Sequence, residues 1–323
     1  MSVSVIRLDR VSKRYPNGQL AVHELTIEVG SGETCMLVGP SGCGKTTTLK
    51  MINRLIQPTS GRIYVDDQDV TESDAVELRR SMGYVIQQVG LFPHLTVGQN
   101  IACVPDLLGW DGNRIRARVE DLLELVGLEP ALYRDRFPNQ LSGGQRQRVG
   151  VARALGADPP ILIMDEPFGA VDRVARDRLQ REFLEIQQRM RKTVVFVTHD
   201  IDEAVRLGDR IAIFKEGGIL EQYDRPARLL GAPATPSVAE FLGPERATRR
   251  LSVTPIEPGW LEPVAGAEAA PAVAAGSSLA EALNLMLLRD VDTVLVEEGG
   301  RPLGSLSVRR LFQVAGEAAQ DPA

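Results

Sequence analysis

The chain is poor in cysteine, and the few cysteines it has are scattered. Only three occur among 323 residues, at Cys35, Cys43 and Cys103. An odd and dispersed set argues against a disulfide framework and is typical of a reduced cytosolic protein. None of the three has the spacing of a metal site.

Long apolar runs are missing as well. No run approaches the roughly 18 residues of a membrane-spanning helix, so we expect no transmembrane segment. The start, MSVSVIRLDR, has no continuous apolar stretch and does not resemble a signal peptide. A net charge of −6 argues against a general nucleic-acid-binding protein, which would normally be basic.

The composition is otherwise that of a soluble protein with a full core, at 43% apolar and 25% charged residues. A length of 323 residues predicts one large domain and a smaller one. We expect the large domain over 1–243, a linker or the start of a regulatory region over 244–277, a small unit over 278–318 and a tail over 319–323.

One glycine-rich stretch fits G-x-x-x-x-G-K-[ST], the phosphate-binding loop. Its glycines let backbone N–H groups form a concave nest for an anion, and the following helix adds its positive N-terminal end. Lys45 can reach the β- and γ-phosphates, and the Thr46 hydroxyl can ligate Mg²⁺. A buried strand over 34–38 and a helix over 46–55 are predicted around it. The candidate phosphate-binding residues are Gly39, Pro40, Ser41, Gly42, Cys43, Gly44, Lys45, Thr46 and Thr47.

Two later strands are predicted to end at the same edge of a sheet. Residues 161–164 are all apolar and precede Asp165 and Glu166, which fits a strand covered on both faces of a parallel sheet. The C-terminal ends of such strands are where open α/β sheets place their chemistry. Asp165 can hold Mg²⁺, usually through water, and Glu166 can polarise the water that attacks the γ-phosphate. A second buried strand, 193–198, delivers His199 to this edge.

Residues 90–155 interrupt the α/β pattern with a helical insert. The apolar positions over 113–126 follow the stripe of an amphipathic helix. Leu141-Ser142-Gly143-Gly144-Gln145 then precedes another helical pattern, which predicts a second helix end able to receive an anion. Before the insert, a short strand over 84–86 ends at Gln87, and the apolar, proline-broken stretch 91–96 is a candidate docking loop.

The N-terminal residues alternate between apolar and polar over 2–30, the period of antiparallel strands with one buried face. A further hairpin is predicted over 62–67. Tyr15 lies in the turn between the first strands and can stack its ring on a base.

With these motifs in this order, the sequence resembles an ATP-binding-cassette (ABC) ATPase from residue 3 to about 240. The resemblance rests on the phosphate loop, the LSGGQ signature at 141–145, the strand ending in Glu166, Asp172 in a D-loop, Gln87 and His199. It implies an α/β P-loop NTPase cassette with a mixed-sheet core, an antiparallel β subdomain and a helical subdomain.

The resemblance also implies a mechanism. Two copies of the chain would clamp two ATP molecules, with Ser142, Gly143, Gly144 and Gln145 of one capping the ATP on the phosphate loop of the other. Lys45 would hold charge, and Thr46, Gln87 and Asp165 would serve Mg²⁺. Glu166 would act as the base or orient the attacking water, His199 would contact the γ-phosphate, and Asp172 would link the two sites.

Several segments away from this site are similar to importers of glycine betaine, carnitine and choline. They lie at 51–61, 87–94, 104–110, 133–138 and 241–251. The resemblance implies a peripheral subunit on the cytosolic face of the membrane, bound to two permease chains and served by an external substrate-binding protein. The alternatives are an importer for an amino acid, polyamine or sugar, a soluble ABC ATPase outside transport, and a non-catalytic nucleotide-sensing module.

Residues 278–318 resemble a single CBS repeat, a small α+β regulatory unit. Ser278 and Glu281 form a capping-box pattern before a helical stripe, and two strands and a helix follow. The ribose-binding positions of a CBS repeat fall on Gly304, Ser307 and Arg310, and arginine cannot accept a hydrogen bond from a ribose hydroxyl. Sensing of anionic lipid or ionic strength and a plain dimerising or stabilising role remain alternatives.

Overall fold

The computed structural model describes residues 4–87, 90–169, 173–264 and 269–317. The chain divides into two compact units, residues 1–223 and 224–323, each with its own core. Within the described residues no helix is both long and apolar enough to cross a membrane.

The first unit contains an antiparallel sheet that is buried on one face. Its strand order is β2-β1-β4-β5, and each adjacent pair is antiparallel. The alternation expected over 2–30 is confirmed, since Leu25, Ile27 and Val29 are buried between exposed neighbours. The bounds are Ser4–Arg14 for β1, Leu20–Gly30 for β2, Ser60–Val65 for β4 and Gln68–Asp69 for β5.

The second sheet of this unit aligns the strands that matter for the site. Its order is β10-β9-β3-β8-β7-β6, and the pairs from β9 to β6 are parallel. All residues of β3, β7 and β8 are buried, as expected from their continuous apolar runs. The bounds are Thr34–Val38 for β3, Met82–Val85 for β6, Ile161–Asp165 for β7, Thr193–Val197 for β8, Arg210–Lys215 for β9 and Ile219–Asp224 for β10.

Parallel pairing brings three C-terminal strand ends to one edge. Leu37 and Asp165 both pair with Val197, so the residues after β3, β7 and β8 emerge together. The phosphate loop follows β3, Glu166 follows β7, and His199 comes two residues after β8. The edge predicted from the sequence is therefore present in the fold.

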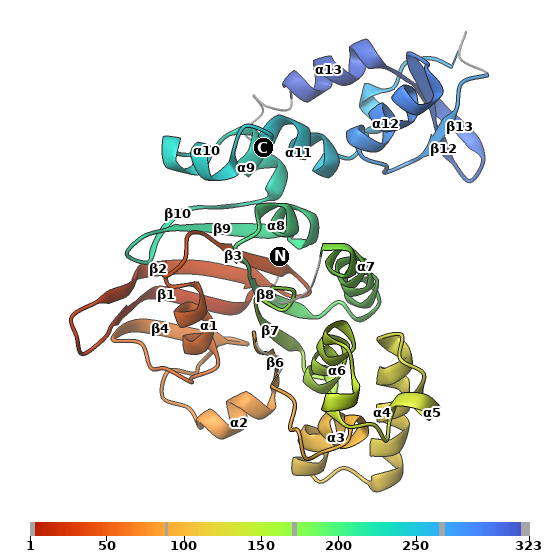
Figure 1. The fold of residues 1–323 in the computed structure, drawn as a ribbon. Helices are drawn as coiled ribbons and strands as arrows, with labels where there is room; N and C mark the ends of the chain where they lie inside the picture. Colours follow the sequence, from red (N-terminus) through yellow and green to blue (C-terminus); the bar gives the residue numbers. More distant parts are fainter. Residues whose placement is uncertain (1–3, 88–89, 170–172, 265–268, 318–323) are drawn as a thin grey trace. The chain divides into compact units, whose positions relative to one another are not determined.

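Helices flank these sheets, and four of them form the expected insert. Figure 1 shows α3, α4, α5 and α6 packed together, and their mutual contacts agree. The bounds are Lys45–Ile52 for α1, Ala75–Arg80 for α2, Val97–Leu107 for α3, Gly112–Leu125 for α4, Pro130–Tyr133 for α5, Gly143–Leu155 for α6, Arg173–Met190 for α7 and Ile201–Leu207 for α8.

Helix α1 ends earlier than the sequence pattern predicted. It stops at Ile52 rather than at residue 55, because Arg54 takes the left-handed backbone conformation with φ of 52°. The N–H groups of Arg54 and Ile56 then turn back to the carbonyls of Met51 and Lys50.

The second unit is a small α+β body. Strand β11 pairs in parallel with β12, which pairs antiparallel with β13. The capping box predicted at Ser278 and Glu281 is confirmed. The Ser278 hydroxyl accepts from the N–H of Glu281, and the Glu281 carboxylate accepts from the N–H of Ser278. The bounds are Pro226–Gly231 for α9, Pro236–Leu242 for α10, Arg246–Val253 for α11, Ala272–Ala274 for β11, Leu279–Arg289 for α12, Thr293–Glu298 for β12, Arg301–Ser307 for β13 and Val308–Glu317 for α13.

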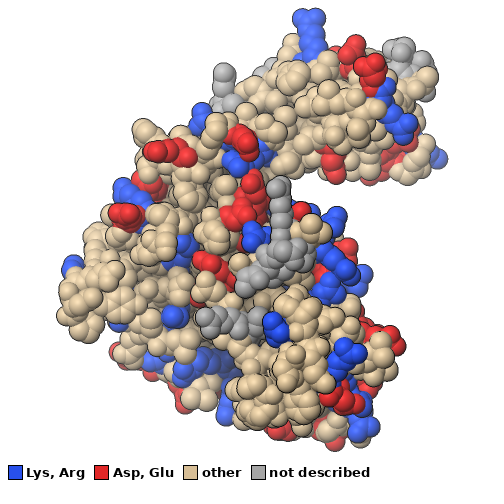
Figure 2. Space-filling model, viewed as in Figure 1, with Lys and Arg blue, Asp and Glu red and all other residues tan. Residues whose placement is uncertain are grey.

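Charged side chains are mixed over the surface. On the face drawn in Figure 2, acidic and basic groups alternate over a mostly uncharged background. On this face, therefore, neither sign of charge forms a single large patch.

Candidate functional site

The phosphate loop lies between β3 and α1, pressed against neighbouring strands. Gly39 has φ of 146° and Gly44 has φ of 98°. A Cβ on Gly39 would lie 2.3 Å from the carbonyl oxygen of Phe214, and one on Gly44 would lie 2.1 Å from that of Ala21. Both positions therefore require glycine, for backbone conformation and for space.

Lys45 is folded into this loop. Only 6% of its surface is exposed, and its Nζ donates to the carbonyl oxygens of Gly39 and Pro40 at 2.8 and 2.9 Å. Lys45 also begins α1, so the first-turn N–H groups of that helix have no acceptor within the helix. A buried ammonium beside a helix N-terminus fits the phosphates of a nucleotide.

Two oxygen donors meet beside the loop. The Thr46 hydroxyl donates to Oδ1 of Asp165 at 2.9 Å. Burial is the largest cause of a raised pKa at Asp165, opposed by the Thr46 hydrogen bond and by the positive charges of Lys50 and Lys45. A hydroxyl and a carboxylate side by side are hard oxygen ligands, a donor set that fits Mg²⁺ bound together with phosphate.

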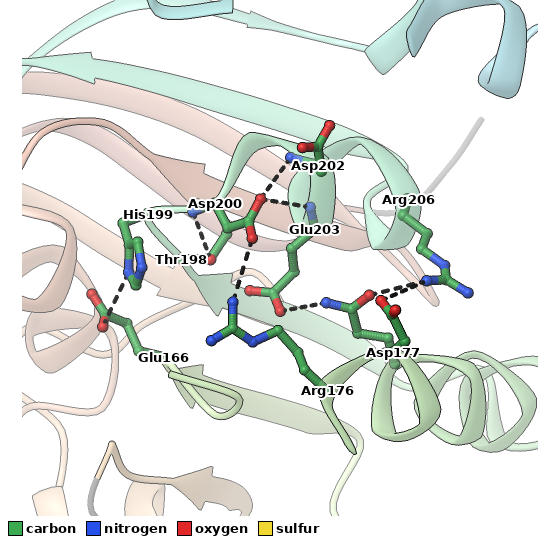
Figure 3. Close-up of polar contacts among 10 residues, drawn as sticks. Glu166, Arg176, Asp177, Thr198, His199, Asp200, Asp202, Glu203 and Arg206 are labelled. Carbon is green, nitrogen blue, oxygen red and sulfur yellow. Dashed lines mark hydrogen bonds and ion pairs between the residues drawn. The ribbon is translucent and has the colours of Figure 1, made fainter. Parts of the chain in front are cut away.

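A second cluster collects on one oxygen of Glu166. Gln87 donates from Nε2 to Oε2 of Glu166 at 3.0 Å, and Nδ1 of His199 lies 3.4 Å from the same oxygen. Figure 3 shows the His199 ring facing this carboxylate. The Glu166 backbone N–H donates to the carbonyl oxygen of Val197, which fixes the residue to β8. Three predicted residues are thus in contact.

The Oε1 of Gln87 is its only atom able to ligate Mg²⁺, and the hydrogen bond to Glu166 uses Nε2 instead. Within the described residues Gln87 therefore contacts Glu166, and its place among the Mg²⁺ ligands stays a prediction.

The signature segment forms the start of α6. Ser142 is the N-cap and accepts from the N–H of Gln145, whose Oε1 accepts from the N–H of Ser142 at 2.9 Å. The Nε2 of Gln145 also donates to the hydroxyl of Tyr133. A Cβ on Gly143 or Gly144 would meet no atom within 4 Å. The packing of this chain therefore does not require glycine at either position.

Not all candidate residues contact one another within the described part of the chain. In the described part of the chain, no hydrogen bond or ion pair connects Ser142–Gln145 with the phosphate loop. Tyr15 lies beside the loop, with its hydroxyl 3.2 Å from Oγ1 of Thr47, and base stacking by its ring stays a prediction. Asp172 lies outside the described residues. The contact from Tyr133 to Gln145 was not anticipated, because no local pattern links a tyrosine twelve residues upstream to the signature.

The fold and this arrangement of side chains define a P-loop nucleotide-binding ATPase. The family model described as ABC transporter matches residues 22–169. The chain is 49% identical to the glycine betaine/carnitine/choline transport ATP-binding protein OpuCA of Bacillus subtilis (strain 168), over 90% of this chain and 75% of that protein. The chain belongs to the family of ABC transporter ATP-binding proteins.

Two further comparisons extend this result. The glycine betaine uptake system ATP-binding protein YehX of Escherichia coli (strain K12) is 44% identical, over 95% of this chain and 99% of YehX. The dimeric post-hydrolysis structure of the cassette MJ0796, bound to ADP and Pi, matches with a TM-score of 0.62 and 35% identity, covering 68% of this chain and 98% of that one.

Proposed function

We propose that this chain is the ATP-hydrolysing, energy-coupling subunit of an importer for quaternary-amine osmoprotectants such as glycine betaine, carnitine and choline. The contact of Gln87, Glu166 and His199 beside the phosphate loop is the observation that carries the ATPase activity. The substrate class is supported by relatives of that function that match along almost the whole chain.

Each residue of the site has a role in this proposal. Lys45 and the N–H groups of the loop bind the β- and γ-phosphates, and Tyr15 stacks on the base. Thr46, Asp165 and Gln87 hold Mg²⁺, which neutralises phosphate charge when bound. Glu166 orients and polarises the attacking water, and His199 contacts the γ-phosphate. The fold supports these roles, because the Thr46–Asp165 pair and the cluster around Glu166 lie at the same edge of the sheet.

We further propose that two copies of the chain pair around ATP. The helix end at Ser142–Gln145 of one copy faces the phosphate loop of the other, and Asp172 links the two sites. The open space at Gly143 and Gly144 supports this pairing, because those glycines leave first-turn N–H groups uncovered for a ligand from outside the chain. The dimeric form of MJ0796 bound to ADP and Pi also supports it.

The permease contact is assigned to the loop at 91–95 and the neighbouring insert. The Phe92 side chain is 45% exposed, and Leu107 and Leu108 at the end of α3 are 63% and 43% exposed. Exposed apolar groups of this kind are typical of protein-binding surfaces. The homodimer would lie on the cytosolic side of two membrane-spanning permease chains, and an external binding protein would supply the substrate.

The second unit is assigned a pairing or stabilising role. Arg310 donates from Nε to the carbonyl oxygen of Trp260, so it serves the packing of this unit. Leu287 and Leu288 on α12 are 74% and 73% exposed, and a second copy of the unit would cover them. Replacing both leucines with serine is expected to leave this unit folded and to weaken its self-association, as measured by analytical ultracentrifugation.

The proposed function is tested by purifying the chain with its permease and measuring ATP turnover with different solutes. Glycine betaine, carnitine or choline, delivered by the external binding protein, is expected to stimulate phosphate release. Stimulation by an amino acid, polyamine or sugar in their place would contradict the substrate class. Absence of Mg-ATP turnover in the complete complex would contradict the ATPase assignment itself.

A further inference from the structure

Glu203 is a buried carboxylate outside the phosphate site. It lies on α8 and only 4% of its surface is exposed. Its Oε1 accepts a hydrogen bond from Nε2 of Gln180 on α7 at 2.9 Å, and the Gln180 side chain is buried as well. A buried carboxyl group is costly unless it is well partnered, so its partners indicate what it does.

Helix α8, which carries Glu203, begins directly after the turn that holds His199. Thr198 precedes His199 directly, and its hydroxyl oxygen accepts from the backbone N–H of Asp200 at 3.0 Å. Oδ1 of Asp200 in turn accepts from the N–H groups of Asp202 and Glu203 at 2.9 and 3.3 Å. Figure 3 shows these groups closing the turn on the side away from Glu166. The backbone on either side of His199 is therefore held by one hydrogen-bonded group.

Further polar contacts link the His199 turn and α8 to α7. Arg176 of α7 lies 3.6 Å from Oδ2 of Asp200, and Arg206 of α8 donates to Oε1 of Gln180 at 3.2 Å. Arg206 also pairs with Asp177 at 3.7 Å, but these side chains are 39% and 58% exposed. Exposed pairs contribute little to stability, whereas the hydrogen bond between Glu203 and Gln180 is buried.

The same groups border the catalytic carboxylate. Glu203, Thr198, His199 and Glu166 all line one small pocket. A shift of α8 against α7 would therefore move His199 relative to Glu166 without touching the phosphate loop.

We propose that Glu203 is a positioning residue for ATP hydrolysis, which sets the place of His199 against Glu166 by tying the His199 turn to α7. The inference rests on the proposed function, in which Glu166 and His199 act on the γ-phosphate side. Displacements of about 1 Å at a reacting group can cost on the order of 100-fold in rate, so loss of this tie should act on turnover. The phosphate loop is on another element, so ATP binding should remain.

The test compares Glu203→Ala and Glu203→Gln with Glu185→Gln, a matched change at an exposed carboxylate of α7. Mg-ATP turnover of the full-length chain is measured under steady-state and single-turnover conditions. We expect Glu203→Ala to lower kcat by about 10- to 100-fold while KM for ATP changes by less than about two-fold. Glu203→Gln keeps an acceptor for Gln180 and should lose less, and Glu185→Gln should match the unmodified chain.

A double-variant cycle separates positioning from general loss of structure. In a His199→Ala background, Glu203→Ala should lower kcat by less than about two-fold further, because the group it positions is gone. An independent, multiplicative loss in that background would overturn the inference. If Glu203→Ala fails to fold, Gln180→Leu cuts the same link from α7, and normal kcat in that variant and in Glu203→Gln would also overturn it. Absence of turnover in the unmodified chain contradicts the proposed function instead.

Discussion

At the scale of single residues, Glu166 is held in an unusual backbone conformation. Its φ of 44° lies in the left-handed region, which residues other than glycine seldom occupy. Its N–H is fixed by Val197 and its carboxylate by Gln87 and His199. Strain on the order of 1–3 kcal/mol persists only where the surroundings over-determine the conformation, and this often occurs at functional sites.

Glu166→Gln tests the role of this carboxylate. The amide keeps the size of the side chain but cannot accept a proton, so ATP binding should be retained and hydrolysis should slow by roughly 10²- to 10⁴-fold. Nucleotide binding by fluorescence and phosphate release measure the two effects separately. Near-normal phosphate release would contradict the proposed role of Glu166.

The pKa of Glu203 predicts a pH dependence of stability. Burial is the main cause of its raised pKa, Asp200 raises it further, and Thr198, Gln180 and Arg176 oppose the shift. Between the ordinary glutamate pKa of about 4.3 and the raised value, the folded state binds more protons than the unfolded state. Stability is therefore lost as the pH rises through this interval.

Glu203→Gln removes this titration. Relative to the unmodified chain, its free energy of unfolding should increase as the pH rises from about 4 and then level off above the raised pKa. Urea unfolding at a series of pH values measures the difference, with Glu185→Gln as the exposed control. A difference that does not change with pH would contradict the argument.

At the scale of elements, α6 combines a well-capped start with glycines that its own packing does not need. Ser142 and Gln145 cap the helix, while Gly143 and Gly144 border open space. Glycine lowers helix stability by up to about 1 kcal/mol relative to alanine, so two of them in the first turn are consistent with the proposed binding of a phosphate from outside the chain.

Gly144→Asp separates folding from function at this helix end. An aspartate in the first turn interacts favourably with the helix dipole, so stability should stay equal or rise by about 0.3–1 kcal/mol. The same charge would repel phosphate, and turnover should fall by about 100-fold or more. Gly144→Asn matches the size without the charge and should lose less. Thermal unfolding and phosphate release are the measurements, and an active aspartate variant would contradict the proposed capping.

Sequence patterns predicted the elements that have a clear hydrophobic pattern. The strands ending at Val38, Asp165 and Val197 were found because buried parallel strands are continuous apolar runs. Strand β11 was missed, since three residues of alanine and valine inside an alanine- and proline-rich stretch carry no alternation. It forms by pairing with β12, a tertiary effect that local sequence does not reveal.

The candidate site likewise has residues that sequence patterns predicted and contacts that they did not. Motif spacing identified Lys45, Thr46 and Asp165, because each follows a recognisable strand or glycine loop. That Gln87 and His199 share one oxygen of Glu166 depends on the register of three strands and could not be predicted. Glu203 was missed altogether, because its significance arises from burial against Gln180 of α7, which lies 23 residues upstream.

At the scale of the whole molecule, one chain has two helix N-terminal ends that could each receive a phosphate, at Lys45 and at Ser142. No described hydrogen bond or ion pair joins them within the chain. A symmetric pair of chains brings unlike surfaces of the two copies together twice, so each ATP site would take one helix end from each copy.

This arrangement predicts complementation between two defective chains. Lys45→Ala should lose phosphate binding and Gly144→Asp should lose capping, so each variant alone should be inactive. In a mixed dimer, the intact loop of the Gly144→Asp chain meets the intact signature of the Lys45→Ala chain. Equal mixing of two chains that pair randomly makes half the dimers mixed, each with one whole site, so activity of up to about a quarter of the unmodified level is expected.

The measurement is phosphate release from the two variants mixed with their permease, compared with each variant alone at the same total concentration. A control mixture of Lys45→Ala with Lys45→Ala,Gly144→Asp leaves no site whole, because neither chain has an intact loop, and should stay inactive. Activity in the first mixture and none in the control requires that each site draws on both copies. If the mixture is no more active than its parts although mixed dimers form, either both sites must be whole for turnover or each chain completes its own. Nucleotide occlusion by the mixed dimer distinguishes these outcomes, since only a shared site retains one ATP per mixed dimer.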